Sequence, residues 1–108
     1  MGMVDVRDVA KAHLLAVTVE AAANRRFLLV AKCAWRKDMA ACLAAEFNSK
    51  GWSVNAEEVT DGSVLDYDVI TTASTEVLGL EYMPIEQTWI DMARSLIEND
   101  FIQKPAAT

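Results

Sequence analysis

The sequence predicts an α/β fold in which three main helices accompany one short buried strand. Apolar residues recur at helical spacing over residues 6–22, 35–50 and 84–100, as in helices that bury one side. Between the first two helices, residues 26–31 (RFLLVA) form an uninterrupted apolar run of strand length, which favours a strand covered on both faces. Weak strand signals follow over residues 52–70.

The first helix is expected to begin after Asp5. An aspartate at the N-cap accepts a hydrogen bond from a free backbone N–H group of the first turn. Asp8 then lies in that turn, where a carboxylate suits the positive end of the helix dipole. We therefore interpret both carboxylates first as helix-start chemistry. The apolar stripe of this helix consists of Val6, Val9, Ala10, His13, Leu14 and Val17.

His13 is the single histidine of the chain and lies on that apolar stripe. No second histidine, CxxC motif or carboxylate cluster stands at metal-ligand spacing, so a packed, hydrogen-bonded histidine is favoured over a ligand or a general base. Cys33 and Cys42 are interpreted as small buried hydrophobic residues of a reducing compartment. A cytoplasmic location follows as the default expectation.

The second helix is expected to end at Gly51, a residue that readily takes the left-handed conformation after a helix. Asn24 is placed to do the same after the first helix. The apolar stripe of the second helix consists of Trp35, Met39, Cys42, Leu43 and Phe47.

The second half of the chain predicts a short helix over residues 72–78, closed by Gly79, and a long helix that starts at Pro84. The stripe of this last helix consists of Ile85, Trp89, Met92, Ala93, Leu96, Ile97 and Phe101. Before it, Asp66 and Asp68 alternate with apolar residues, as on an edge strand. Solvated edge carboxylates are favoured there over a general acid/base pair.

Length and charge bound the class of protein. With 108 residues the chain is a single domain or a domain fragment over residues 1–103, followed by a disordered tail over residues 104–108. The net charge of −6 disfavours nucleic acid and anionic membrane as partners. No apolar run is long enough to span a membrane. Residues 1–50 hold 8 Lys/Arg and 5 Asp/Glu, while residues 51–108 hold 2 and 11, which favours two differently solvated faces.

Three stretches, in one continuous order, carry a resemblance to a known family. They are VDVRDVAKAHLLAV at residues 4–17, NRRFLLVAKCAWRKDMA at residues 24–40 and LGLEYMPIEQTWIDMARSLIENDFI at residues 78–102. The first is similar to a V-D-V/D-D-V-A-x-A-H pattern, the second to G-R-Y-L-x-S-S followed by W-x-E-I/M-A, and the third to L-G-L/F-x-Y-x-P-L-E-x-T. Together they resemble the C-terminal part of the extended short-chain dehydrogenase/reductases, in particular the dihydroflavonol reductase and cinnamoyl-CoA reductase-like group.

The resemblance implies the substrate-domain portion of a Rossmann-type reductase. Full-length members of this family are NAD(P)-dependent oxidoreductases that use NADP or NAD to interconvert a small-molecule carbonyl substrate and its alcohol. This chain would supply substrate-cleft and packing elements. The family's Gly-rich cofactor fingerprint is absent, and so is its Tyr-x-x-x-Lys pair, because Tyr67 and Tyr82 are followed four residues on by Thr71 and Glu86. We therefore assign no catalytic, cofactor-binding or metal-binding residue, and we expect the chain alone to be inactive.

A second hypothesis stays open at this point. The chain can also be a non-catalytic small α/β module for binding or oligomerisation, which shares only ancestry with the reductases. Its exposed apolar faces would then promote self-association.

Overall fold

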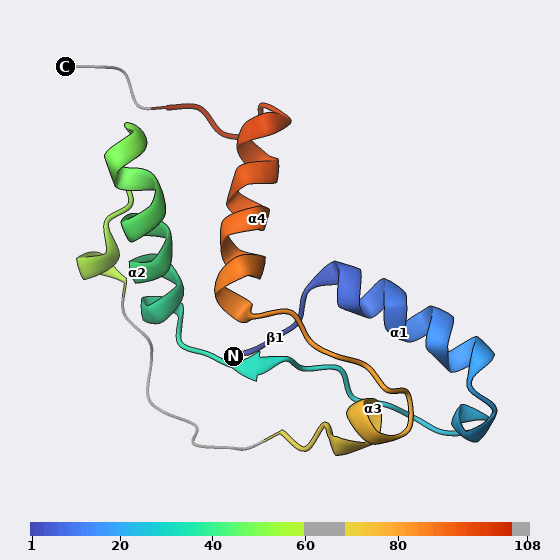
Figure 1. The fold of residues 1–108 in the computed structure, drawn as a ribbon. Coiled ribbons are helices and arrows are strands. Elements are labelled where there is room, and N and C mark those ends of the chain that lie inside the picture. The colour runs from blue at the N-terminus through green and yellow to red at the C-terminus, as the bar shows by residue number, and fades with distance from the viewer. Residues whose placement is uncertain (60–68, 105–108) are drawn as a thin grey trace. The chain divides into compact units, whose positions relative to one another are not determined.

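The computed structural model describes residues 1–59 and 69–104 as a small α/β chain with four α-helices and a two-stranded antiparallel sheet (Figure 1). This confirms the α/β class. The described residues form two compact units. The first comprises residues 1, 34–59 and 86–104, and the second comprises residues 2–33 and 69–85.

The second unit contains the sheet and two α-helices. In the sheet, Gly2 pairs with Cys33 and Met3 with Lys32. Its elements are β1 (Gly2–Met3), α1 (Val6–Thr18), the 3₁₀ helix η1 (Glu20–Ala22), β2 (Lys32–Cys33) and α3 (Thr72–Glu76).

The first unit contains two long helices, α2 (Arg36–Phe47) and α4 (Ile85–Glu98), of which α4 has its first residue in the other unit. Figure 1 shows these two helices side by side, and an ion pair between Glu46 and Arg94 joins them. Two 3₁₀ helices follow α2 in the chain, η2 (Asn48–Lys50) and η3 (Ala56–Glu58). The three predicted long helices therefore exist, with ends that differ by a few residues.

The core of the second unit is a small apolar cluster that joins α1, η1 and the segment after α3. Its buried members are Ala12, Ala22, Leu78 and Leu80, with Leu15, Val19, Phe27, Leu29 and Tyr82 packed against them. Burial of these side chains is the main favourable term in the stability of this unit.

The predicted orientation of α1 is wrong. Val6, Leu14 and Val17 of the predicted stripe are 77%, 65% and 85% exposed, and His13 is exposed as well. The packed side instead carries Asp8 and Ala12, followed by Leu15 and Val19. The helix thus buries its small and acidic side, because Ala12 allows close approach and Asp8 has a hydrogen-bond partner.

The prediction of a buried strand over residues 26–31 is also wrong. The strand that forms is β2, which begins at Lys32, directly after the predicted range. It is only two residues long, and both of its residues are exposed. The reason is the length of its partner: after Met3, whose carbonyl accepts from the Ala31 N–H, the chain turns toward the start of α1. Leu28 is 57% exposed, so the apolar run is not covered on both faces.

Weak strands were predicted for residues 52–70, and residues 60–68 of this range lie outside the described residues. In the described parts of this range no strand forms, and residues 56–58 form η3 instead. Lys104 is the first residue of the predicted tail, and its ammonium group lies 5.9 Å from the centre of the Trp52 ring. Residues 105–108 of the predicted tail lie outside the described residues.

The left-handed conformations predicted for three residues are confirmed, although α1 ends at Thr18, before the predicted end, and Asn24 follows η1. Asn24, Gly51 and Gly79 all have positive φ angles, of 60°, 89° and 70°. After α2, the Trp52 N–H donates to the Phe47 carbonyl, so a carbonyl left free at the helix end is satisfied. After α3, the Leu80 N–H donates a hydrogen bond to the Ser74 carbonyl.

The stripe of α4 is confirmed in its first half. Ile85 and Trp89 are buried, whereas Met92 is 45% exposed. Phe101 does not extend the stripe, because α4 ends at Glu98 and the Phe101 side chain is 76% exposed. In α2, the predicted stripe is buried at Phe47 and open at Trp35, which is the N-cap.

Trp89 and Met92 provide a matched test of this burial. Trp89→Ala is expected to lower the free energy of unfolding by about 3–5 kcal/mol, because it removes a large buried side chain and leaves a cavity. Met92→Ala, one turn further along the same helix, is expected to change it by only about 0.5 kcal/mol. Urea unfolding followed by circular dichroism measures both, and equal small effects would contradict the burial of Trp89.

Candidate functional site

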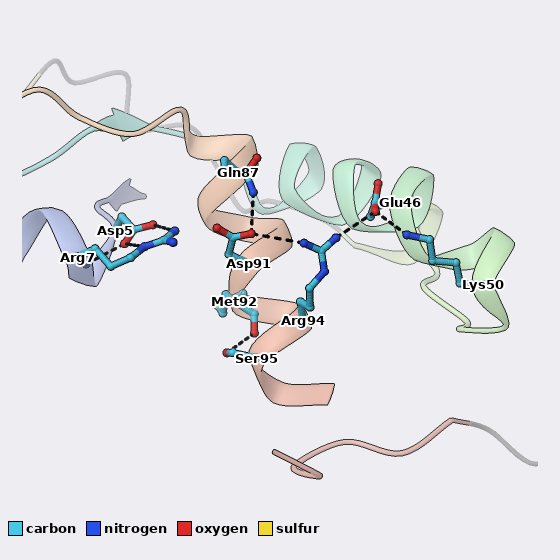
Figure 2. A network of polar contacts seen from close by, with 9 residues as sticks. All are labelled: Asp5, Arg7, Glu46, Lys50, Gln87, Asp91, Met92, Arg94 and Ser95. Carbon is cyan, nitrogen blue, oxygen red and sulfur yellow. Dashed lines mark hydrogen bonds and ion pairs between the residues drawn. The ribbon is translucent and has the colours of Figure 1, made fainter. Parts of the chain in front are cut away.

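Asp5 is the N-cap of α1, as the sequence predicts. Its carboxylate accepts from the Arg7 backbone N–H at 2.8 Å. It also accepts from the Arg7 guanidinium, through Nε at 2.9 Å and Nη2 at 2.8 Å (Figure 2). Asp5 is buried, so these charged hydrogen bonds compensate for removing the carboxylate from water. The Asp5 carboxylate is therefore held as an acceptor that stabilises the start of the helix.

Asp8 does more than the dipole interaction that the sequence predicts. It lies in the first turn of α1 and is only 4% exposed. Its Oδ2 accepts a hydrogen bond from the Met83 backbone N–H at 2.9 Å, from 75 residues away in the chain. This bond attaches the segment before α4 to the start of α1, within one unit.

A second polar contact fixes the same segment. Ser74 is fully buried and donates its hydroxyl hydrogen to the Thr71 carbonyl at 2.7 Å. Its oxygen lies 2.7 Å from the Tyr82 hydroxyl. Because the Ser74 hydrogen is already used, Tyr82 donates in this pair. The Tyr82 hydroxyl therefore takes part in a contact that fixes this segment.

The first unit has its own polar network between α2 and α4. Glu46 accepts from Lys50 at 2.7 Å and lies 3.5 Å from Arg94, which in turn lies 3.8 Å from Asp91 (Figure 2). The Gln87 amide donates to Asp91 at 2.6 Å. The pKa of the Glu46 carboxyl is lowered, first by the hydrogen bond from Lys50 and then by the charge of Lys50. Desolvation opposes this shift, and the charge of Arg94 lowers the pKa to a lesser extent. Such exposed ion pairs orient helices and contribute little stability.

The remaining predicted candidates do not come together. The His13 Nδ1 lies 2.7 Å from the Val9 carbonyl, so the ring is hydrogen-bonded as predicted, but it is exposed and not packed. Asp66, Asp68 and Tyr67 lie outside the described residues.

The two cysteines are free and differ in environment. Cys33 is exposed, so the prediction that it is buried is wrong. Cys42 is half-buried, and its thiol pKa is raised by burial first, and then by the negative charges of Glu86 and Glu46. The thiolate fraction of Cys42 at neutral pH is therefore lower than that of an ordinary cysteine.

The N-termini of the three long helices are unfavourable positions for the pyrophosphate of a dinucleotide. A pyrophosphate binds at a helix N-terminus because free backbone N–H groups and the dipole attract it. Each long helix of this chain instead carries an acid in its first turn, namely Asp8 in α1, Asp38 in α2 and Glu86 in α4. The α1 terminus is in addition capped by Asp5. These carboxylates repel phosphate, and no step through a nicotinamide cofactor is assigned to this chain.

No family model, curated protein or solved structure matches the chain. In the part of the chain that the structure describes, no three His, Cys, Asp or Glu side chains are grouped so that they could hold a metal ion. Within the same residues, no helix has the length and apolar character needed to cross a membrane.

Sequence reasoning missed the two contacts that hold the segment before α4. The pattern around Asp8 indicates the helix dipole alone, and its bond to Met83 joins residues too far apart for any local pattern to relate them. The Ser74–Tyr82 pair was missed because Ser74 lies in a short polar helix. The available signal was the apolar sequence around Tyr82, since a phenol that packs against apolar residues needs a hydrogen-bond partner.

Removal of the Asp8 carboxylate is expected to release Met83. Asp8→Ala should lower the free energy of unfolding by about 1–3 kcal/mol, because the Met83 N–H loses its acceptor. Asp38→Ala removes an exposed first-turn acid and should cost only about 0.3–1 kcal/mol. Hydrogen exchange of the Met83 amide should accelerate in the first variant alone. Unchanged exchange there would show that the bond is not formed.

The cysteines are expected to alkylate at different rates. Iodoacetamide should modify Cys33 before Cys42, and the Cys42 reaction should need a higher pH, because its thiol pKa is raised. The raised pKa favours the folded state below the ordinary thiol pKa, and this contribution is lost as the pH rises through the raised value. Mass spectrometry of native and urea-unfolded protein provides the comparison. The difference should vanish on unfolding, and equal native rates would contradict the burial of Cys42.

Proposed function

We propose that this chain is the substrate-side, carboxyl-terminal part of an NAD(P)-dependent oxidoreductase of the extended short-chain type. The full-length protein would be a Rossmann-type carbonyl/alcohol reductase similar to the dihydroflavonol reductase and cinnamoyl-CoA reductase-like group. The chain contributes elements of the substrate cleft and helices that pack on the rest of the enzyme. The cofactor and the catalytic residues belong to the part that this sequence lacks.

The observation that carries the proposal is the convergence of the three family-like stretches on one apolar cluster. Residues 4–17 contribute Ala12 and Leu15, residues 24–40 contribute Phe27 and Leu29, and residues 78–102 contribute Leu78, Leu80 and Tyr82. Stretches that are distant in the chain thus pack together, as parts of one inherited arrangement would.

The polar contacts support the same interpretation. Asp8, in the first stretch, holds the backbone of Met83, in the third stretch. Asp8 belongs to the first family-like pattern, and Met83 lies between the Tyr and the Pro of the third. The D-V-A pattern and the L-G-L-x-Y-x-P pattern are then two ends of one hydrogen-bonded arrangement, which gives a physical reason for their occurrence in the same chain.

The surface of α1 supports an origin in a larger protein. Its packed side is apolar at Ala12, Leu15 and Val19, and its outer side exposes Val6, Leu14 and Val17. A helix with apolar residues on both sides is typical of the interior of a larger protein.

The alternative is a self-standing module that associates through the same exposed side of α1. Large exposed apolar patches mark interaction sites, so this side also favours self-association. The coding sequence upstream of Met1 discriminates between the two proposals. An in-frame Gly-rich strand–turn–helix there favours the reductase, and a stop codon with a start signal favours the module.

The isolated chain is expected not to bind NADPH or NADH. The acids in the first turns of its long helices repel pyrophosphate, and no Gly-rich loop is present to approach it. Isothermal titration calorimetry with each nucleotide measures this, with a complete short-chain reductase as the positive control. Saturable binding in the micromolar range would contradict the assignment of the cofactor site to another part of the protein.

A chimera tests the proposed function directly. Residues 2–103 replace the carboxyl-terminal substrate-side stretch of an active reductase of the dihydroflavonol reductase-like group. The chimera is expected to bind NADPH and to reduce carbonyl compounds faster than the same host truncated at the junction. Activity is followed as NADPH oxidation over a panel of aldehydes and ketones, because the substrate specificity of the graft is new.

Two variants of the chimera test whether its gain in activity depends on the packing of the grafted residues. Asp8→Ala is expected to remove the gain, because it releases the Met83 segment. Lys11→Ala, an exposed position on the same helix, is expected to retain it. A chimera that binds NADPH yet stays as inactive as the truncated host would overturn the proposal.

A further inference from the structure

We draw no further inference here: the strongest candidate, the exposed apolar side of α1 formed by Val6, Leu14 and Val17, is an unpartnered helix face, and nothing in the structure shows what covers it.

Discussion

The second unit, which contains α1, depends on the hydrogen bond from the Met83 backbone N–H to the Asp8 carboxylate. A carboxylate that is 4% exposed is costly unless its oxygens have partners, so this bond and the helix dipole together allow Asp8 to be buried. Once Asp8 lies inward, the geometry of a helix places Ala12, Leu15 and Val19 on the same side. The packed side of α1 is therefore the side that gives Asp8 its partner and buries Ala12, Leu15 and Val19, and not the most apolar stripe.

Features decided by a residue's own backbone could be predicted from the sequence. Asp5 caps α1, and Asn24, Gly51 and Gly79 take left-handed conformations in the turns after η1, η2 and α3. Each depends only on a local preference, for a side-chain acceptor or for tolerance of a positive φ angle. The start of α4 belongs to the same class, since Ile85 directly follows Pro84.

Features that need a distant partner could not be predicted. The run at residues 26–31 has the composition of a buried strand, but a strand forms only beside another, and β1 offers two residues, opposite Lys32 and Cys33. The Ser74–Tyr82 hydrogen bond likewise depends on the chain reversing at Gly79, whose position was predicted while its consequence for these side chains was not. The spacing of apolar residues predicts that one side of a helix or strand is buried. It does not predict which part of the chain packs on that side.

The α1 helix gives this distinction an energetic meaning. Burying a Val or Leu side chain contributes about 1.5–3 kcal/mol, and Val6, Leu14 and Val17 leave most of that contribution unrealised. For a domain whose total stability is about 5–15 kcal/mol, this is a large fraction. Under the proposed function, a second domain supplies the missing contacts, and α1 is stable because it is covered on both sides. Under the proposed function, the exposed apolar side of α1 packs on the rest of the enzyme. Asp8 and Ala12 instead make contacts within the second unit.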